Sequence, residues 1–278
     1  FDRYGVARVL SIDELAMALM VFNAARGIGP GGLATSHDSG GERGLIVDLA
    51  HDIGTRFAKL APETVRRLEA ALDFGLPPVN PLDRWGTGRN FPTDFRESFQ
   101  ALMADPDTAM GALVLDRAAA GAIVPEYLKV AHAAHQDSGK PTFLVSNHQG
   151  SGTSADAVAS TRAGVPVLDG VPAFLVASRL LFEWRDFMAR AAAKPPAIES
   201  KVVKVWRARL LGLDPRTGAT SLDEFEGLRL LAEFGVPPTA CARATSADEA
   251  VAAAHHAGYP VALKSAAPGL AHKSDVGG

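Results

Sequence analysis

The stretch AMGALVLD, residues 109–116, decides the fold class of this 278-residue chain, because it is an unbroken apolar run that ends in an acid. The stretch KPTFLVSN, residues 140–147, repeats the pattern and ends in an amide. Continuous apolar runs of this length are typical of strands that are buried on both faces of a parallel sheet. With further short apolar runs, five strands are predicted, at 32–37, 55–59, 109–116, 141–146 and 165–168.

Helical stretches separate the predicted strands, which indicates a doubly wound α/β domain with a parallel sheet of about five strands. In such sheets ligands bind at the carboxyl ends of the strands. The predicted helices lie at about 41–53, 62–72, 92–104, 125–137, 152–163 and 172–190.

A helix is also predicted before the sheet, because Ser11-x-x-Glu14 is a capping box. Its apolar face would carry Leu15, Leu19 and Phe22, and Gly27 would end it. We therefore divide the chain into a connecting helix, the α/β domain, a basic and loop-rich linker, and a second unit, at residues 1–27, 28–190, 191–219 and 220–278.

In the second unit, two more capping boxes predict helices that begin near Ser221-x-x-Glu224 and Ser246-x-x-Glu249. The first helix would turn Phe225, Leu228 and Leu231 inward, and the second would end at Gly258. The stretch YPVALKS, residues 259–265, is predicted to be a strand, and a loop rich in glycine follows it.

Composition narrows the functional classes. A formal net charge of −3 gives no electrostatic reason to expect nucleic acid binding. A single cysteine excludes an internal disulfide and is typical of a reducing compartment, so we expect a cytoplasmic location. No apolar run reaches about 20 residues, so no membrane span is expected. The chain begins at Phe1 and ends in a glycine pair, and we expect it to be a fragment of a longer polypeptide.

The stretch SHDSGGERGLIVDLAHDIG, residues 36–54, is the first candidate site. If Ser39 is the N-cap, then Gly40, Gly41 and Glu42 occupy the first helical turn with unpaired N–H groups, and such a turn attracts a phosphate. However, Ser39-x-x-Glu42 is itself a capping box, in which the carboxylate would cover the helix end. An anion site and an ordinary capped helix both remain open.

Other polar residues receive a structural interpretation. His37, Asp38 and Ser39 cannot form a catalytic triad, because consecutive strand residues point to alternate faces, although His37 could face the cleft. The stretch VNPLD, residues 79–83, is predicted to be a rigid turn with polar tips that could line the cleft. No metal site is assigned, because the remaining histidines and the cysteine lack suitable partners: His132, His135, His255, His256 and Cys241.

Lys264 and His272 carry more information. Lys264 ends an apolar strand pattern, so its stem would be buried unless an anion meets its head. His272 lies in a loop bounded by glycine and proline, where a histidine can carry a phosphoryl group, act as a general base, or have no chemical role.

These residues resemble a known family. The stretch from Thr220 to Gly278, which contains GYPVALK and HKSDVGG, resembles the opening of the ATP-grasp domain of NDP-forming acyl-CoA synthetases, which include ADP-forming acetyl-CoA synthetase. The stretches SGGERGLIVDLAHDIG, NPLDRWGTG, GKPTFLVSN and GVPVLDGVPAF resemble the succinyl-CoA-synthetase-like flavodoxin domain of fused members. The resemblance implies a flavodoxin-like domain followed by a partial α+β ATP-grasp segment.

The resemblance also implies an activity. Family members interconvert acyl-CoA, phosphate and ADP with free acid, CoA and ATP, through acyl phosphate and phosphohistidine. Ser39, Gly40 and Gly41 match a helix end that stabilises phosphohistidine, His272 matches a histidine of the phosphoryl relay, and Lys264 matches a lysine that contacts nucleotide phosphates. The implied cofactors are ATP or ADP, CoA, phosphate and Mg²⁺.

This chain departs from the family pattern in what it lacks. The SHTG-type segment with the principal phosphorylated histidine, the CoA-binding domain and most of the ATP-grasp fold are not in it. We therefore expect the chain to work with the remaining domains of the same polypeptide and not to complete the reaction alone. A homodimer is a further option. The alternatives are a regulatory synthetase-like module of a protein lysine acetyltransferase and a non-catalytic ligand-binding scaffold.

Overall fold

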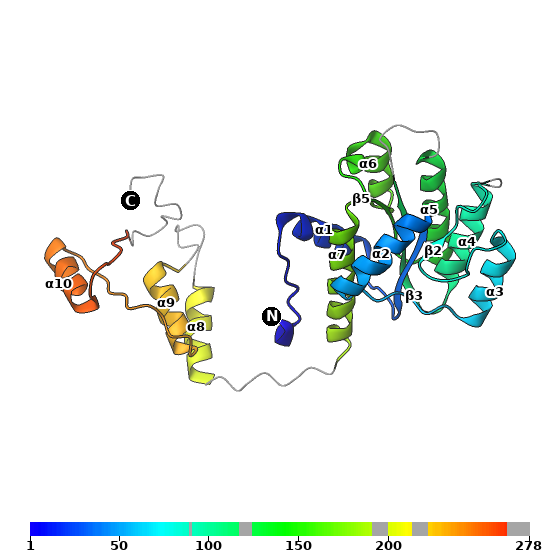
Figure 1. Cartoon of the computed structure of the whole chain (residues 1–278). Coiled ribbons are helices and arrows are strands. Elements are labelled where there is room, and N and C mark those ends of the chain that lie inside the picture. Colours follow the sequence, from blue (N-terminus) through cyan, green and yellow to red (C-terminus); the bar gives the residue numbers. More distant parts are fainter. Residues whose placement is uncertain (89–90, 117–123, 191–199, 213–221, 266–278) are drawn as a thin grey trace. The chain divides into compact units, whose positions relative to one another are not determined.

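The computed structural model describes residues 1–88, 91–116, 124–190, 200–212 and 222–265. The chain forms two compact units, Phe1–Ala191 and Ala192–Gly278 (Figure 1). None of the helices in the described ranges has the length and apolar character needed to cross a membrane. The first unit contains η1 (Asp2–Tyr4), α1 (Ile12–Ala24), β1 (Gly32–His37), α2 (Gly40–Ile53), α3 (Pro62–Ala71), β2 (Leu82–Asp83), α4 (Thr93–Ala104), β3 (Thr108–Leu115), α5 (Val124–Ser138), β4 (Thr142–Ser146), η2 (Ser151–Thr153), α6 (Ala155–Arg162), β5 (Val167–Asp169) and α7 (Val171–Met188).

The five strands form one parallel sheet in the order β2-β1-β3-β4-β5. This is the flavodoxin-like order, and it confirms the predicted doubly wound α/β domain. The chain leaves β1 toward β2 on one side and returns to β3 on the other, so the carboxyl ends of β1 and β3 form the topological switch point. Ligands of such folds bind at this point.

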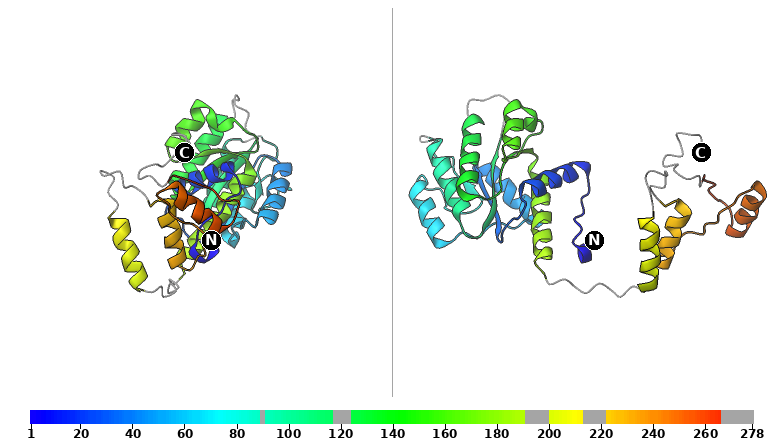
Figure 2. Two further views of the ribbon diagram at one scale, coloured as in Figure 1. Left: turned by 90° about the vertical axis from the view of Figure 1, so that its left-hand side faces the viewer. Right: turned by 180° about the vertical axis from the view of Figure 1, so that it is seen from behind.

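Helices cover both faces of the sheet (Figure 2). One apolar cluster packs α1, α2 and α7 against the sheet through residues such as Val21, Ile46 and Phe174. The other packs α3, α4 and α5 against the opposite face, through residues such as Leu68 and Phe99. The strands β1, β3 and β4 are buried along their whole length, as their apolar runs predicted.

One strand was predicted at the wrong place. Residues 55–59 form only an isolated bridge between Leu33 and Phe57, and the fifth strand is Leu82–Asp83, inside the predicted turn. The reason is Asn80, whose side chain takes the place of a neighbouring strand. Its Oδ1 accepts from the Thr35 N–H at 3.0 Å, and its Nδ2 donates to the carbonyls of Leu33 and Ala58 at 2.9 and 3.0 Å.

The capping box before α1 is confirmed, because the Glu14 N–H donates to Ser11 Oγ at 3.1 Å. The predicted apolar face is wrong in part. Met17, Ala18 and Val21 are buried against the sheet side, whereas Leu15 and Leu19 are 42% and 63% exposed. The sequence pattern was ambiguous here because α1 is apolar on both sides.

The second unit contains α8 (Ser200–Leu211), α9 (Glu224–Glu233) and α10 (Ala247–Ala257). Helix α8 lies inside the stretch expected to be a loop-rich linker, and its Trp206 is buried and donates from Nε1 to Glu233 Oε2 of α9 at 2.8 Å. Helix α9 is capped by Asp223 rather than by Ser221, which lies outside the described residues. Helix α10 has its predicted cap at Ser246 and ends at Gly258.

No strand forms at residues 259–265, where one was predicted. A strand needs a partner for its backbone groups, and the described part of the second unit holds no other strand. Leu263 is accordingly 84% exposed. Of the three residues predicted to face inward on α9, Phe225 and Leu228 are half-buried, whereas Leu231 is 43% exposed.

Candidate functional site at the carboxyl edge of the sheet

Every strand of the sheet ends at a polar residue on the same edge. Because the strands are parallel, these residues come together there: Asp38 after β1, Asp83 in β2, Asp116 after β3, Asn147 after β4 and Asp169 in β5. The helix α2 begins at this edge, directly after β1 and at the switch point. The site predicted from the stretch at 36–54 therefore lies where the fold class places ligands.

The first turn of α2 is open. Ser39 is the N-cap with extended backbone angles, and its side chain accepts no capping hydrogen bond from the described chain. The first intrahelical bond at this end runs from the Arg43 N–H to the Ser39 carbonyl. Within the described ranges, the N–H groups of Gly40, Gly41 and Glu42 have no acceptor. Three unpaired N–H groups at a positive helix end form a binding surface for an anion.

The two glycines have different surroundings. At Gly40 an added Cβ would lie 3.0 Å from Asp83 Oδ2, so the backbone approaches that carboxylate closely. At Gly41 an added Cβ would meet only Ser39 Oγ, at 3.5 Å. Both glycines are exposed. Gly41 is therefore the position where a substitution changes access to the helix end without disturbing packing.

Glu42 does not cover the helix end, so the capping box that its spacing suggested is not formed. Its Oε1 accepts from Asn147 Nδ2 at 2.7 Å, and its Oε2 is buried without a hydrogen-bond donor in the described residues. Burial, then hydrogen bonding to Asp38, then the negative charges of Asp38 and Asp116 raise the pKa of the Glu42 carboxyl to about 9. Glu42 is therefore protonated and neutral at pH 7.

Side chains from α5 and the β4 loop hold the neighbouring acids. Tyr127 donates its hydroxyl to Asp38 Oδ2 at 2.8 Å, and burial raises the pKa of this phenol. Asn147 Nδ2 also donates to Asp116 Oδ1 at 3.0 Å. The described residues contain no group of three or more His, Cys, Asp or Glu placed to hold a metal ion. The acids here form a hydrogen-bonded network beside the helix end.

His37 takes no part in this network. It is fully buried, and its Nε2 is 3.0 Å from Thr35 Oγ1 on the same strand. Burial, and then the charge of Arg43, lower the pKa of His37 to about 3, so the ring is neutral. The possibility that His37 faces the cleft is thus wrong.

Two predicted site residues, Lys264 and His272, belong to the second unit. Lys264 is half exposed, and its Nζ lies 2.6 Å from Glu224 Oε1 at the start of α9. The burial expected for its stem is therefore not observed, because the strand that would bury it is not formed. His272 lies outside the described residues.

Asp116, Tyr127 and Asn147 were not predicted as members of the site. Two of them were detectable in principle, because Asp116 and Asn147 each directly follow a buried strand and so had to reach the same edge. Tyr127 lies in α5, and no short-range signal connects it to Asp38, which is 89 positions away.

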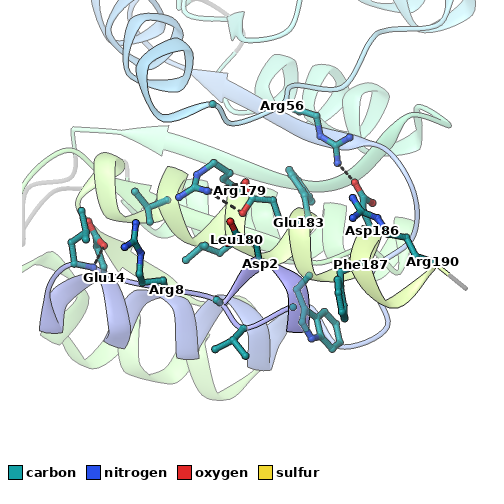
Figure 3. A pocket seen from close by; sticks show the side chains of 18 residues that line it. Asp2, Arg8, Glu14, Arg56, Arg179, Leu180, Glu183, Asp186, Phe187 and Arg190 are labelled. Carbon is teal, nitrogen blue, oxygen red and sulfur yellow. Dashed lines mark hydrogen bonds and ion pairs between the residues drawn. The ribbon is translucent and has the colours of Figure 1, made fainter. Parts of the chain in front are cut away.

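A separate cavity of about 680 Å³ lies between the N-terminal segment and α7 (Figure 3). Four arginines and four acids line it, and several of them neutralise one another. Arg179 pairs with Glu183 at 2.8 Å, and Arg56 pairs with Asp186 at 2.6 Å. It lies away from the carboxyl edge of the sheet and has no excess of either charge.

The sheet order defines a flavodoxin-like domain, and the open first turn of α2 lies at its switch point. A family model described as an ATP-grasp domain matches residues 215–278. The chain is 27% identical over 286 residues to a trans-feruloyl-CoA synthase of an unknown prokaryotic organism, a match that covers 99% of this chain and 38% of the relative. It is 28% identical over 289 residues to the ADP-forming acetate–CoA ligase I of Archaeoglobus fulgidus, covering 100% of this chain and 38% of the relative.

Solved structures show the same fold. A Pyrococcus horikoshii OT3 protein matches with a TM-score of 0.58 at 19% identity, over 68% of this chain and 43% of that one. The dinucleotide-forming acetyl-coenzyme A synthetase 1 of Ca. Korarchaeum cryptofilum, in complex with phosphate and ADP, matches with a TM-score of 0.57 at 14% identity, over 69% of this chain and 42% of that one.

These matches support a relationship between this chain and the NDP-forming acyl-CoA synthetases. These two alignments cover nearly all of this chain but only 38% of the length of each relative.

Proposed function

We propose that this chain is part of an acid–thiol ligase that interconverts acyl-CoA, phosphate and ADP with a free carboxylic acid, CoA and ATP. In this proposal the open first turn of α2 holds the phosphoryl group while it is transferred. The single observation that carries the proposal is the set of unpaired N–H groups of Gly40, Gly41 and Glu42 at the switch point. The printed activity of the acetate–CoA ligase relative supports the reaction class.

The protonation of Glu42 limits the negative charge that a bound anion would meet at this helix end. A phosphoryl group brings up to two negative charges, and the acids Asp38, Asp83 and Asp116 already lie nearby. The proton on Glu42 removes one negative charge from the edge, and Asn147 holds the Glu42 carboxyl away from the open N–H groups. The anion would thus meet N–H donors and a neutral carboxyl at the start of α2.

In this proposal the nucleotide and CoA bind away from the carboxyl edge of the sheet. Lys264 would bind nucleotide phosphates, and His272 would accept and pass on the phosphoryl group, in line with the ATP-grasp match over residues 215–278. ATP or ADP, CoA, phosphate and Mg²⁺ are the cofactors of the proposed reaction. Because the relatives are longer than this chain, CoA binding is assigned to the remaining domains of the same polypeptide.

The exchange of Gly41 for glutamate tests the proposed anion site. Gly41→Glu adds a negative side chain in the first turn, where the space is open, and should weaken inorganic phosphate binding about three- to tenfold by calorimetry. Gly44→Glu is the matched control, because it adds the same charge to the same helix, one turn farther on, at a glycine with no neighbour within 4 Å. Equal affinity in the two variants would contradict the site.

A second experiment addresses the division of labour between domains. The 278-residue chain, supplied with acyl-CoA, phosphate, ADP and Mg²⁺, should form no ATP, whereas the full-length gene product should. ATP formation by the chain alone would overturn the assignment of CoA binding to other domains.

A further inference from the structure

The helix α1 is apolar on both sides. Met17, Ala18 and Val21 pack toward α7 and the sheet. The opposite side carries Ile12 and Leu19, which are 79% and 63% exposed, together with Leu15 and Met20. A helix that is apolar all round is normally buried all round. The outward face of α1 is therefore unpartnered within the described chain.

The segment before α1, Val6–Leu10, is bonded through its backbone only at its two ends, where the Val6 N–H donates to the Phe1 carbonyl at 3.3 Å and the Leu10 N–H donates to Glu14 Oε2 at 2.7 Å. It forms neither helix nor strand, although the sequence VARVL is rich in strand formers. Ala7, Arg8 and Val9 make no backbone hydrogen bond to any described residue. Val6 and Leu10 are 49% and 82% exposed. Open backbone groups beside apolar side chains are the property of a strand that can join a sheet.

The segment is fixed at its start. A Cβ at Gly5 would lie 2.4 Å from Phe187 Cδ1, so the backbone of Gly5 rests directly on the Phe187 ring of α7. The lining of the cavity in Figure 3 includes both this segment and α7. The segment is thus held at both ends, by Gly5 on α7 and by the Leu10 N–H, which donates to Glu14 Oε2 at the start of α1.

A second copy of this chain offers no suitable sheet edge in its described part. The edge strands β2 and β5 have two and three residues, which is too short to pair with a five-residue strand. The relatives, by contrast, contain more chain than this region, since the match covers 38% of each. A sheet in that remainder would be tethered to this chain, and docking within one polypeptide has a high effective concentration.

We propose that Val6–Leu10 and the outward face of α1 form a strand–helix unit that docks on an α/β domain in the remaining part of the same polypeptide. The Val6–Leu10 backbone joins the edge of that domain's sheet, and Ile12, Leu15 and Leu19 pack on its face. The inference does not depend on the proposed ligase activity.

Amide hydrogen exchange of Ala7, Arg8 and Val9 tests this docking surface. In the isolated 278-residue chain these amides should exchange as freely as a disordered peptide, and in the full-length gene product at least about 100-fold more slowly. Equal rates in the two proteins would overturn the proposal. The proposal would also be overturned if these amides exchanged slowly in the isolated chain and sedimentation experiments showed that this chain is a dimer. The docking partner would then be a second copy.

Two variants make the test specific. Leu19→Asp places a charge on the outward face, and Ala7→Pro removes a backbone donor; both should restore fast exchange in the full-length protein. In the isolated chain both should melt within about 1 °C of the parent, because neither group has a partner there. Val158→Asp, on the exposed side of α6, is the control and should leave exchange slow. Retained protection in both test variants would contradict the docking surface.

Discussion

The helices α2 and α10 begin with the same motif, Ser-x-x-Glu, and use it in opposite ways. At α10 the Glu249 N–H donates to Ser246 Oγ at 3.2 Å, and the Glu249 carboxylate accepts from the Thr245 N–H at 2.7 Å. At α2 neither half of the box forms, and Glu42 bonds to Asn147 instead. The helix end is thus closed in one case and open in the other.

The difference comes from what surrounds each helix. Helix α10 buries no residue, so its glutamate finds only local donors and completes the box. Helix α2 begins at the carboxyl edge of a buried sheet, where Asn147 from β4 offers a donor to Glu42. A capping motif therefore predicts a helix start reliably, but tertiary neighbours decide whether the end remains available to a ligand.

The pKa values of the two glutamates express the same contrast. Hydrogen bonds from the Thr245 N–H, and then from its hydroxyl, lower the pKa of Glu249. Burial and neighbouring acids raise the pKa of Glu42 to about 9. One motif position thus contains an ionised carboxylate at pH 7, and the other contains a neutral acid.

The largest effect is expected from a change of Asn147, which holds the Glu42 carboxyl away from the open N–H groups of α2. Asn147→Leu removes the donor to both Glu42 and Asp116, and leaves two acceptors without it. We expect the free energy of unfolding to fall by about 2 kcal/mol in urea denaturation at pH 7. Gln149→Leu changes an exposed amide two positions along the same loop and should have little effect. A similar loss in both variants would show that the loop, not the hydrogen bond, is responsible.

A smaller effect with opposite signs is expected from the two glutamates. The native state keeps a proton on Glu42 between about pH 4.5 and 9, where the unfolded chain does not, so its contribution to stability falls as pH rises through this window. Glu42→Gln removes this pH dependence and should stabilise the protein by about 1 kcal/mol at pH 8. The effect is smaller than the full pKa shift would give, because solvent screens the partly exposed carboxyl.

Glu249→Gln should act in the other direction. The lowered pKa of Glu249 means that its contribution is present above the unfolded value of 4.5 and is lost as pH falls through the folded value. The substitution should therefore weaken α10 at neutral pH and have no effect in acid. Stability curves of both variants from pH 3 to 9 measure this contrast; curves of the same sign would break it.

The smallest effect concerns the two serines. Ser246→Ala removes a cap and should destabilise the first turn of α10 by about 0.5 kcal/mol, seen as faster amide exchange there. Ser39→Ala removes no capping bond and should leave exchange in α2 unchanged. Faster exchange in α2 after Ser39→Ala would mean that its hydroxyl caps the helix in solution.

The parts of the fold that local physics determines were predictable. Strands β1, β3 and β4 followed from unbroken apolar runs, and α1 and α10 from their caps. Strand β2 was not predictable, because this part of the sheet depends on Asn80. Its side chain accepts a hydrogen bond from the Thr35 N–H, 45 positions earlier, as the backbone of a neighbouring strand would. The strand at 259–265 also failed, since a strand exists only with a partner, and no sequence window contains that partner.

The candidate site also has one part that could be predicted from the sequence and one part that could not. Ser39, Gly40 and Gly41 were candidates from the motif, and the structure adds the open geometry of this helix end; their binding of an anion stays a prediction. The protonated state of Glu42 was not predictable, because it depends on Asp38, Asp116 and Asn147, which meet only when the strands are assembled.

A titration of the ¹⁵N-labelled chain with inorganic phosphate at pH 7, followed by amide chemical shifts, tests the open helix end most directly. The account predicts saturable shifts at Gly40 and Gly41, with no comparable change at Ala247 and Asp248 in the closed first turn of α10. Equal shifts at the two helix ends, or none at Gly40 and Gly41 up to tens of millimolar phosphate, would contradict it.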